Sequence, residues 1–182
     1  MSLLGIIASQ NYPRITGSYE SIATVTVGGA TGYAEFTSIP STFTHLQVRL
    51  ITDTSAGDVS ITARFNGDTG SNYAYHTFYG DGSGAYQNYN GVSQTSYVSF
   101  ARGGNASGVF GAAVIDILDY KDTNKYKTVK SLTGKDNNGS GLMWLSSGLW
   151  QSTSAITSIR LTPESGNLNQ YSSFALYGIK GA

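Results

Sequence analysis

The strongest constraint in this sequence is an alternation of apolar and polar residues with a period of two, which recurs along almost the whole chain. Residues 45–51, HLQVRLI, place an apolar side chain at every second position, and residues 58–66, DVSITARFN, repeat the pattern. Such alternation is typical of a half-buried β-strand, because successive side chains of a strand point to opposite faces. Further strand candidates lie at 19–27, 33–39, 72–79, 92–100, 109–120, 125–133, 141–150, 156–162 and 172–179.

Turn-forming residues separate most of these segments. The stretches VGGATG, NGDTG, GDGSG, KDTN and DNNGSG supply the Gly, Asn and Asp that tight turns require. No segment of helix length shows a convincing 3.6-residue amphipathic period. We therefore expect an all-β fold, an antiparallel β-sandwich of jelly-roll type with about ten strands.

The length of 182 residues fits one domain that buries a core without metal or disulfide support. We expect a single β-sandwich domain over residues 19–182, preceded by an N-terminal strand or docking arm over residues 1–18. The apolar run LLGIIA at 3–8 has no Lys or Arg before it and is far shorter than the roughly 20 residues that span a bilayer. It is interpreted as a short strand or anchor, and no membrane insertion is expected.

The composition excludes several classes of function. Cysteine is absent, which removes disulfides, thiolate nucleophiles and Cys-containing zinc sites. The 11 basic and 11 acidic residues balance, so no overall field attracts nucleic acid. Lysines do gather in residues 119–130, but Asp119 and Asp122 lie among them, and we interpret this stretch as a solvated hairpin whose lysines protect a sheet edge. Those lysines are Lys121, Lys125, Lys127 and Lys130.

Residues that could carry catalysis or hold a metal are sparse. His45 and His76 lie within alternating strands and not beside a Ser or Asp of a nucleophile motif. The glycine-rich stretch 80–84 lacks the helix and the lysine of a phosphate-binding loop. Four oxygen-bearing residues at adjacent turns could in principle approach a calcium ion, but their spacing fits turn capping better. Those four are Asp53, Asp58, Asn66 and Asp68. We therefore predict no catalytic residue, no cofactor and no metal.

Aromatic side chains supply the candidate surface contacts. Alternation places Tyr73, Tyr75 and Tyr79 on one face of their strand, and tyrosine suits both protein interfaces and sugar stacking. Tryptophan is a frequent interface hot spot. The candidate contacts are Tyr73, Tyr75, Tyr79, Tyr86, Tyr89 and Trp144. The alternative is that the tyrosines only decorate a pleated surface, where they are favoured anyway, and that tryptophan packs in the core.

The last strand candidate, SSFALYGI at 172–179, is apolar on both faces. Phe174 and Leu176 would face the core, whereas Ala175, Tyr177 and Ile179 would line the opposite side. We expect this strand to lie in the middle of a sheet. Because its second face also needs cover, we predict that Ala175, Tyr177 and Ile179 form a subunit interface.

The order of several segments resembles a family of small structural proteins associated with the capsid or tail of tailed bacteriophages. The segments that carry the resemblance are LLGIIAS, YESIATVTVGG, FTHLQVRL, FNGDTGSNY, DILDYKDTNKYKTVKSLTG, SGLW, ITSIRLTP and FALYGIKG. The resemblance implies a β-sandwich virion component, usually a homotrimer, without enzymatic activity. It also implies other virion proteins as partners, such as the major capsid or tail protein.

From these observations we expect a homotrimeric capsid decoration protein on the exterior of a phage particle. Such a protein would be retained by many weak contacts repeated over a symmetric lattice. The alternative is a tail-fibre-associated module that binds a glycan of the host surface. A further hypothesis is a carbohydrate-binding module that does not belong to a virus.

Overall fold

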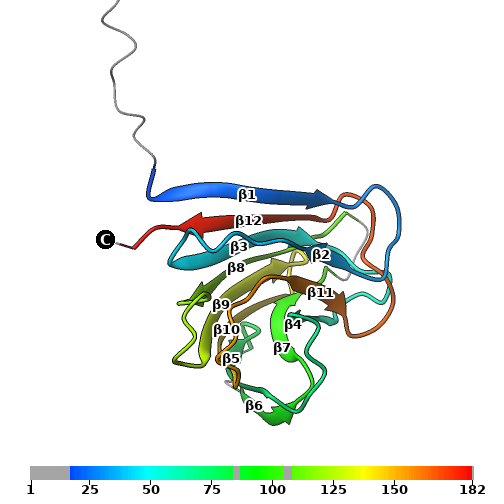
Figure 1. Cartoon of the computed structure of the whole chain (residues 1–182). Coiled ribbons are helices and arrows are strands. Elements are labelled where there is room, and N and C mark those ends of the chain that lie inside the picture. The colour runs from blue at the N-terminus through cyan, green and yellow to red at the C-terminus, as the bar shows by residue number, and fades with distance from the viewer. Residues whose placement is uncertain (1–16, 84–86, 105–107, 182) are drawn as a thin grey trace, which may run out of the picture.

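The computed structural model describes residues 17–83, 87–104 and 108–181, which form twelve antiparallel strands and no helix (Figure 1). The strands are β1 (Tyr19–Thr26), β2 (Ala34–Phe36), β3 (His45–Thr52), β4 (Ser60–Phe65), β5 (Tyr73–Gly80), β6 (Gln87–Gln94), β7 (Tyr97–Arg102), β8 (Gly111–Leu118), β9 (Lys127–Asp136), β10 (Gly141–Trp150), β11 (Ile159–Pro163) and β12 (Ser173–Ile179). The expected all-β sandwich is confirmed, with two strands more than the expected ten. Most of the predicted arm over residues 1–18 lies outside the described residues.

The strands form two sheets of unequal width. The large sheet has the order β1-β12-β3-β8-β9-β10-β5-β6, and the small sheet has the order β2-β11-β4-β7. The hairpins β5–β6 and β9–β10 widen the large sheet. Four strands that are not part of these added hairpins, β1, β3, β8 and β12, lie in the large sheet, and β2, β4, β7 and β11 make up the small one. In Figure 1 the last strand, β12, runs between β1 and β3; it lies inside the large sheet, as expected, but second from the edge and not at the centre.

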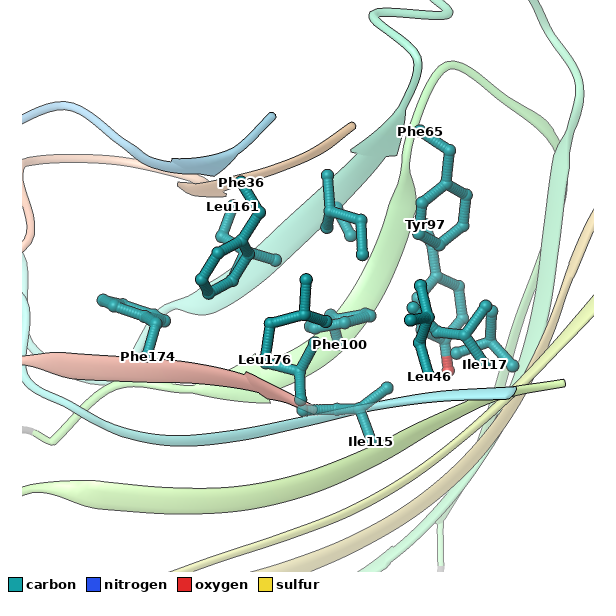
Figure 2. Packing of buried hydrophobic residues seen from close by; sticks show 14 of the residues in the cluster. Phe36, Leu46, Phe65, Tyr97, Phe100, Ile115, Ile117, Leu161, Phe174 and Leu176 are labelled. Atoms are coloured by element: carbon teal, nitrogen blue, oxygen red, sulfur yellow. The ribbon is translucent and has the colours of Figure 1, made fainter. Parts of the chain in front are cut away.

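The core lies between the sheets and follows from the alternation. Leu46, Val48 and Leu50 of β3 point inward and are buried, while the residues between them point to the outer face. Figure 2 shows Phe36 and Leu161 of the small sheet directed toward Phe174 and Leu176 of β12. These side chains belong to one cluster that runs through the sandwich. Burial of this apolar surface is the main favourable term in folding.

Sequence periodicity misplaces one element. Residues 92–100, expected as one strand, belong to two: β6 ends at Gln94 in the large sheet, and β7 begins at Tyr97 in the small sheet. The chain crosses between the sheets at Thr95 and Ser96, which lack the Gly, Pro, Asn or Asp that gives the stronger turn signal. The alternation of apolar and polar residues therefore gives no sign of this crossing.

Two strand glycines admit aromatic rings from other parts of the sandwich. A Cβ atom at Gly148 of β10 would lie 2.2 Å from Cε2 of Tyr97, and one at Gly178 of β12 would lie 2.3 Å from Cδ2 of Phe43. Both distances are far below van der Waals contact. The absent side chains let Tyr97 of the small sheet and Phe43 of the β2–β3 connection sit directly on the large sheet's backbone.

We predict that Gly148→Ala destabilises the fold by about 1–3 kcal/mol, because the added methyl group overpacks the site of Tyr97. Gly134→Ala is a matched control, since a Cβ there would have Leu142 O, at 4.0 Å, as its nearest neighbour. That control should be neutral or slightly stabilising. Urea unfolding followed by circular dichroism measures both free energies of unfolding, and equal values would contradict the packing described here.

Candidate interaction surfaces

The outer face of the large sheet carries a band of exposed apolar side chains. Strand register aligns Val114, Leu132, Leu145 and Phe78 in one row across β8, β9, β10 and β5. Their exposed fractions run from 40% for Val114 to 51% for Leu132. A second row contains Ile51, Ala112, Gly134 and Met143, with Met143 64% exposed. We call Ile51, Phe78, Val114, Leu132, Met143 and Leu145 the outer apolar band.

A polar row borders this band on the same face. Gln47, Asp116, Lys130, Ser147 and His76 occupy successive strands in register. Gln47 donates a hydrogen bond from Nε2 to Oδ1 of Asp116 at 2.8 Å. The face therefore has an apolar centre and a polar margin, which is the usual anatomy of a protein interface.

The outer face is also hollowed in two places. One depression of about 420 Å³ lies over β3, β8, β9 and β10 and is lined by Arg49, Val114, Leu132 and Met143, among others. Another of about 580 Å³ is lined by Phe78 and Leu145 together with polar residues of the margin. Most of the outer apolar band lines one or the other depression.

The size of the face matches what a protein partner covers. Eight strands spaced about 4.8 Å apart span about 34 Å, and eight residues at about 3.3 Å each span about 26 Å, which gives roughly 900 Å². Each partner in a stable interface contributes about 800 Å². The largest apolar patch on a monomeric protein is usually about 300–600 Å² and is often functional, so an apolar band across neighbouring strands of this face indicates an interaction site.

The predicted interface residues Ala175, Tyr177 and Ile179 lie on this same outer face and are half-buried. Tyr177 is partly covered within the chain, because its ring stacks on Tyr19 at 4.8 Å between centroids. The guanidinium of Arg49 lies 5.3 Å from the Tyr19 ring and 5.7 Å from the Tyr177 ring. Their role in a subunit interface stays a prediction.

The expectation that Tyr73 and Tyr75 are surface contacts is wrong. Both side chains are buried in the core. The hydroxyl of Tyr73 accepts the backbone N–H of Phe65 at 3.0 Å, and its ring stacks on Trp150. Burial raises the pKa of Tyr73 to about 12. Alternation correctly put Tyr73 and Tyr75 on one face, but that face points inward.

The other aromatic candidates have different environments. Tyr79 is half-buried, and Trp144, expected at the surface, is buried with 8% of its area exposed. Tyr86 lies outside the described residues. Tyr89 pairs with Thr77 across β5 and β6, and its side chain is also outside the described set.

Tyr79 and Trp144 line a cavity of about 310 Å³ that also has residues of the small sheet in its wall. Their rings stack at 5.1 Å between centroids, and the guanidinium of Arg102 lies 4.5 Å from the Trp144 ring centroid. Asp58 pairs with both Arg102 and Lys135, at 2.6 Å in each case. Because Arg102 belongs to β7 and Lys135 to β9, this ion cluster bridges the two sheets at the cavity, which we call the mouth cavity.

Two buried polar atoms of the mouth cavity have no hydrogen-bond partner among the described residues. They are Nε1 of Trp144, a donor, and Oδ1 of Asn137, an acceptor. A buried polar group without a partner costs about 1–3 kcal/mol. Nearby, Asp81 accepts bonds from the backbone N–H and the hydroxyl of Ser83, which lower the pKa of its carboxyl group.

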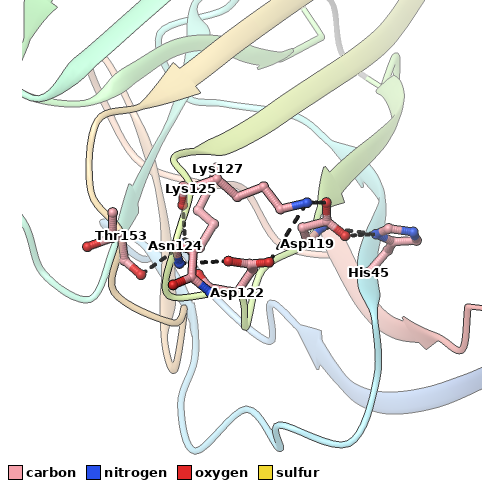
Figure 3. Close-up of polar contacts among 7 residues, drawn as sticks. All are labelled: His45, Asp119, Asp122, Asn124, Lys125, Lys127 and Thr153. Atoms are coloured by element: carbon pink, nitrogen blue, oxygen red, sulfur yellow. Dashed lines mark hydrogen bonds and ion pairs between the residues drawn. The ribbon is translucent and has the colours of Figure 1, made fainter.

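The histidine and lysine candidates have structural environments. Nδ1 of His45 accepts the backbone N–H of Asp119 at 2.9 Å, so the neutral ring carries its proton on Nε2. Figure 3 shows Lys125 between the carboxylates of Asp119 and Asp122, at 2.6 and 3.8 Å. The ion pair with Lys125 lowers the pKa of Asp119. No Asp is adjacent to His45 in the sequence, as expected. The fold nevertheless places Asp119 beside this histidine.

Lys127 corrects the interpretation of residues 119–130 as a solvated hairpin. Its side chain is fully buried, and Nζ donates to the carbonyl oxygens of Asp122, Lys125 and Thr153 at 2.5, 2.9 and 3.2 Å. Burial lowers the pKa of this ammonium group. The lysine therefore fixes the β8–β9 turn to the segment after β10 and does not protect an edge. No sequence signal distinguishes it from the exposed lysines around it.

The four calcium candidates are engaged separately. Asp53 accepts from Asn169, Asp58 belongs to the ion cluster of the mouth cavity, and Asp68 accepts the indole N–H of Trp150 at 2.7 Å. Oδ1 of Asn66 accepts the backbone N–H groups of Thr157 and Ser158. Within residues 17–83, 87–104 and 108–181, no group of three or more His, Cys, Asp or Glu side chains is arranged to hold a metal ion.

Comparison with protein-family models, curated proteins and solved structures gives no match for this chain. None of the described residues forms a helix able to cross a membrane.

We predict that Lys127→Met destabilises the protein by at least about 1–3 kcal/mol, because three buried carbonyl oxygens lose their donor. Lys125→Met is the matched control, since Lys125 is exposed and solvent screens its ion pairs with Asp119 and Asp122. Chemical denaturation at neutral pH measures both. If the two variants unfolded at the same denaturant concentration, Lys127 would not have the role assigned to it.

Proposed function

We propose that this protein is a non-enzymatic structural protein of a tailed-bacteriophage particle, most simply a capsid decoration protein that self-associates into a homotrimer. The phage assignment rests on the sequence resemblance alone. The self-association rests on one observation, the outer apolar band on the large sheet.

We further infer that eight strands, four from each sheet, form a jelly roll. In this view β1, β12, β3 and β8 form one of its sheets, and β2, β11, β4 and β7 form the other. The hairpins β5–β6 and β9–β10 are then additions to one sheet. Such double-sheet bodies are common in viral capsid proteins, although a fold does not by itself specify a function.

The outer apolar band supports an assembly role because of its position. The outer face of an antiparallel sheet is normally polar when water covers it. Here Leu132 and Leu145 lie opposite each other at the centre of the face, with about half of each side chain exposed. Burying them against a partner removes apolar surface from water, at about 25 cal/mol for each Å².

The partner that we assign to this face is a second copy of the chain. The formal net charge is zero, so copies approach without long-range repulsion. The polar margin contains both Asp116 and Lys130, so it offers charges of both signs to a neighbouring copy, whose contacting surface in a closed trimer differs from this face. The face is also about as large as the surface that one subunit commits to a stable interface.

We predict that the purified protein has a mass near three times 19.2 kDa by light scattering after size exclusion. Leu132→Lys should shift it toward 19.2 kDa, because a buried unpaired charge at the centre of the face is strongly unfavourable. Leu145→Lys should do the same.

Thr162→Lys on the small sheet is the control and should leave the mass unchanged. Circular dichroism should show the native β spectrum for all three variants, because each replaced side chain is at least partly exposed. A wild-type mass of 19.2 kDa at every concentration tested would refute self-association.

A second measurement tests the particle assignment. A decoration protein should bind emptied phage capsids and raise their resistance to heat or osmotic shock. The alternative, a receptor-binding module of the tail fibre, should bind host cells or their polysaccharide and leave capsids unaffected. Capsid binding that is lost in Leu132→Lys would link retention to multivalent assembly.

A further inference from the structure

The mouth cavity has features that closing the sandwich does not require. If these residues only closed the end of the sandwich, we would expect their polar groups to pair with one another. Arg102 is paired in this way, because its guanidinium donates to Asp58 and to the hydroxyl of Ser60. Trp144 instead holds its indole N–H buried, with no partner among the described residues, beside a cavity of about 310 Å³. Native proteins rarely leave such a group unpaired.

The unpaired atoms are of opposite kinds. Nε1 of Trp144 is a donor only, whereas Oδ1 of Asn137 is an acceptor. A ligand that serves both must donate and accept hydrogen bonds in a small space. Hydroxyl groups do both. Because neither atom is accessible to water, the ligand reaches them through small shifts of the side chains that line the cavity.

The charges around the cavity favour an uncharged ligand. Arg102 and Lys135 both pair with the carboxylate between them, that of Asp58, which offsets one of their two positive charges. Asp81, which also lines the cavity, supplies a second negative charge. The two positive and two negative groups balance, so the site has no surplus charge to attract an anion or a cation.

The size and the walls define the ligand further. The volume is at the lower end of the range of about 300–1,000 Å³ for small-molecule sites. The half-buried ring of Tyr79 supplies an aromatic wall on which the C–H face of a sugar ring can pack, whereas the Trp144 ring is covered by Tyr79 and Arg102 and offers its N–H edge. The arrangement therefore fits one sugar ring and excludes a long chain.

We propose that the mouth cavity binds a neutral, hydroxyl-rich ligand of the size of a single sugar ring, with the Trp144 indole N–H donating to one ligand hydroxyl and Asn137 Oδ1 accepting from another. This site involves the inward face of β10, whereas the assembly surface involves its outward face. The inference therefore does not depend on self-association or on a place in a phage particle.

The two tryptophans provide a direct test by nuclear magnetic resonance. The chain has two indole N–H groups, and that of Trp150 already donates to Asp68 at 2.7 Å. Glucose, galactose, mannose and N-acetylglucosamine, each titrated into nitrogen-15-labelled protein, are the probes. We expect the Trp144 signal to shift saturably with at least one of them while the Trp150 signal stays in place.

Variants assign the contacts. Trp144→Phe keeps an aromatic ring but removes the donor, and Asn137→Ala removes the acceptor; each should weaken binding about tenfold, the usual loss for one hydrogen bond. In these variants binding is followed by calorimetry. Asn90→Ala is the matched control, because Asn90 is exposed on the outer face, and it should bind like the unmodified protein.

The contrary results are equally specific. No saturable shift with any of the four sugars, or equal shifts of both indole signals, would overturn the proposal. Tighter binding of glucuronate than of glucose would overturn the assignment of an uncharged ligand. If Leu132→Lys lost self-association but still bound sugar, the result would agree with both proposals. It would also show that the two can be judged separately.

Discussion

The arrangement of the molecule depends on aromatic rings that sit directly on strand glycines of the large sheet. Tyr97 from the small sheet lies on Gly148, and Phe43 from the β2–β3 connection lies on Gly178. Close approach of ring to backbone excludes any side chain at these positions, so each ring packs directly against the backbone of the large sheet. Gly178 belongs to β12 and Gly148 to β10, on opposite sides of β3, β8 and β9. These two contacts therefore pack the small sheet and its connections against both halves of the large sheet, which has twice as many strands.

That difference in width explains where the candidate surfaces lie. The strands added to the large sheet, β5, β6, β9 and β10, contribute Phe78, Leu132, Met143 and Leu145 to the outer apolar band. The same added strands contribute Tyr79, Lys135 and Trp144 to the mouth cavity. These strands also reach the core, because Tyr73, Val129 and Trp150 belong to the same cluster as Leu46 and Leu161. The two hairpins thus widen the large sheet and supply much of both surfaces.

Periodicity predicted most strands because an inward apolar row and an outward polar row leave a clear signature, as in β3 and β4. It could not specify which face is inward when both are rich in Tyr, Thr or Leu, and this is why Tyr73 and Tyr75 were assigned to the surface. Nor could it identify Lys127, whose acceptors are backbone carbonyl oxygens, one of them of Thr153 on a distant segment. Trp144 was a candidate from its residue type. Its setting beside Arg102 and Tyr79 depends on a pairing between β5 and β10 that local pattern does not encode. The apolar second face of β12, by contrast, was evident from alternation alone, and Ala175 does lie on the outer face beside Arg49.

Strand β10 carries the two surfaces on alternate residues. Met143 and Leu145 point outward into the apolar band, and Trp144 between them points inward to the mouth cavity. Any shift of Trp144 that brings its indole N–H to a ligand acts on a backbone that is hydrogen bonded on both sides, to β9 and to β5. Such a strand resists displacement along the sheet, so the adjustment is confined to side chains. A partner on the outer face adds contacts to Met143 and Leu145 without changing the register that positions Trp144. We therefore expect the free energies of assembly and of ligand binding to be nearly independent. Coupling between two sites requires an element that can adopt two arrangements, whereas a strand paired on both sides has a single arrangement.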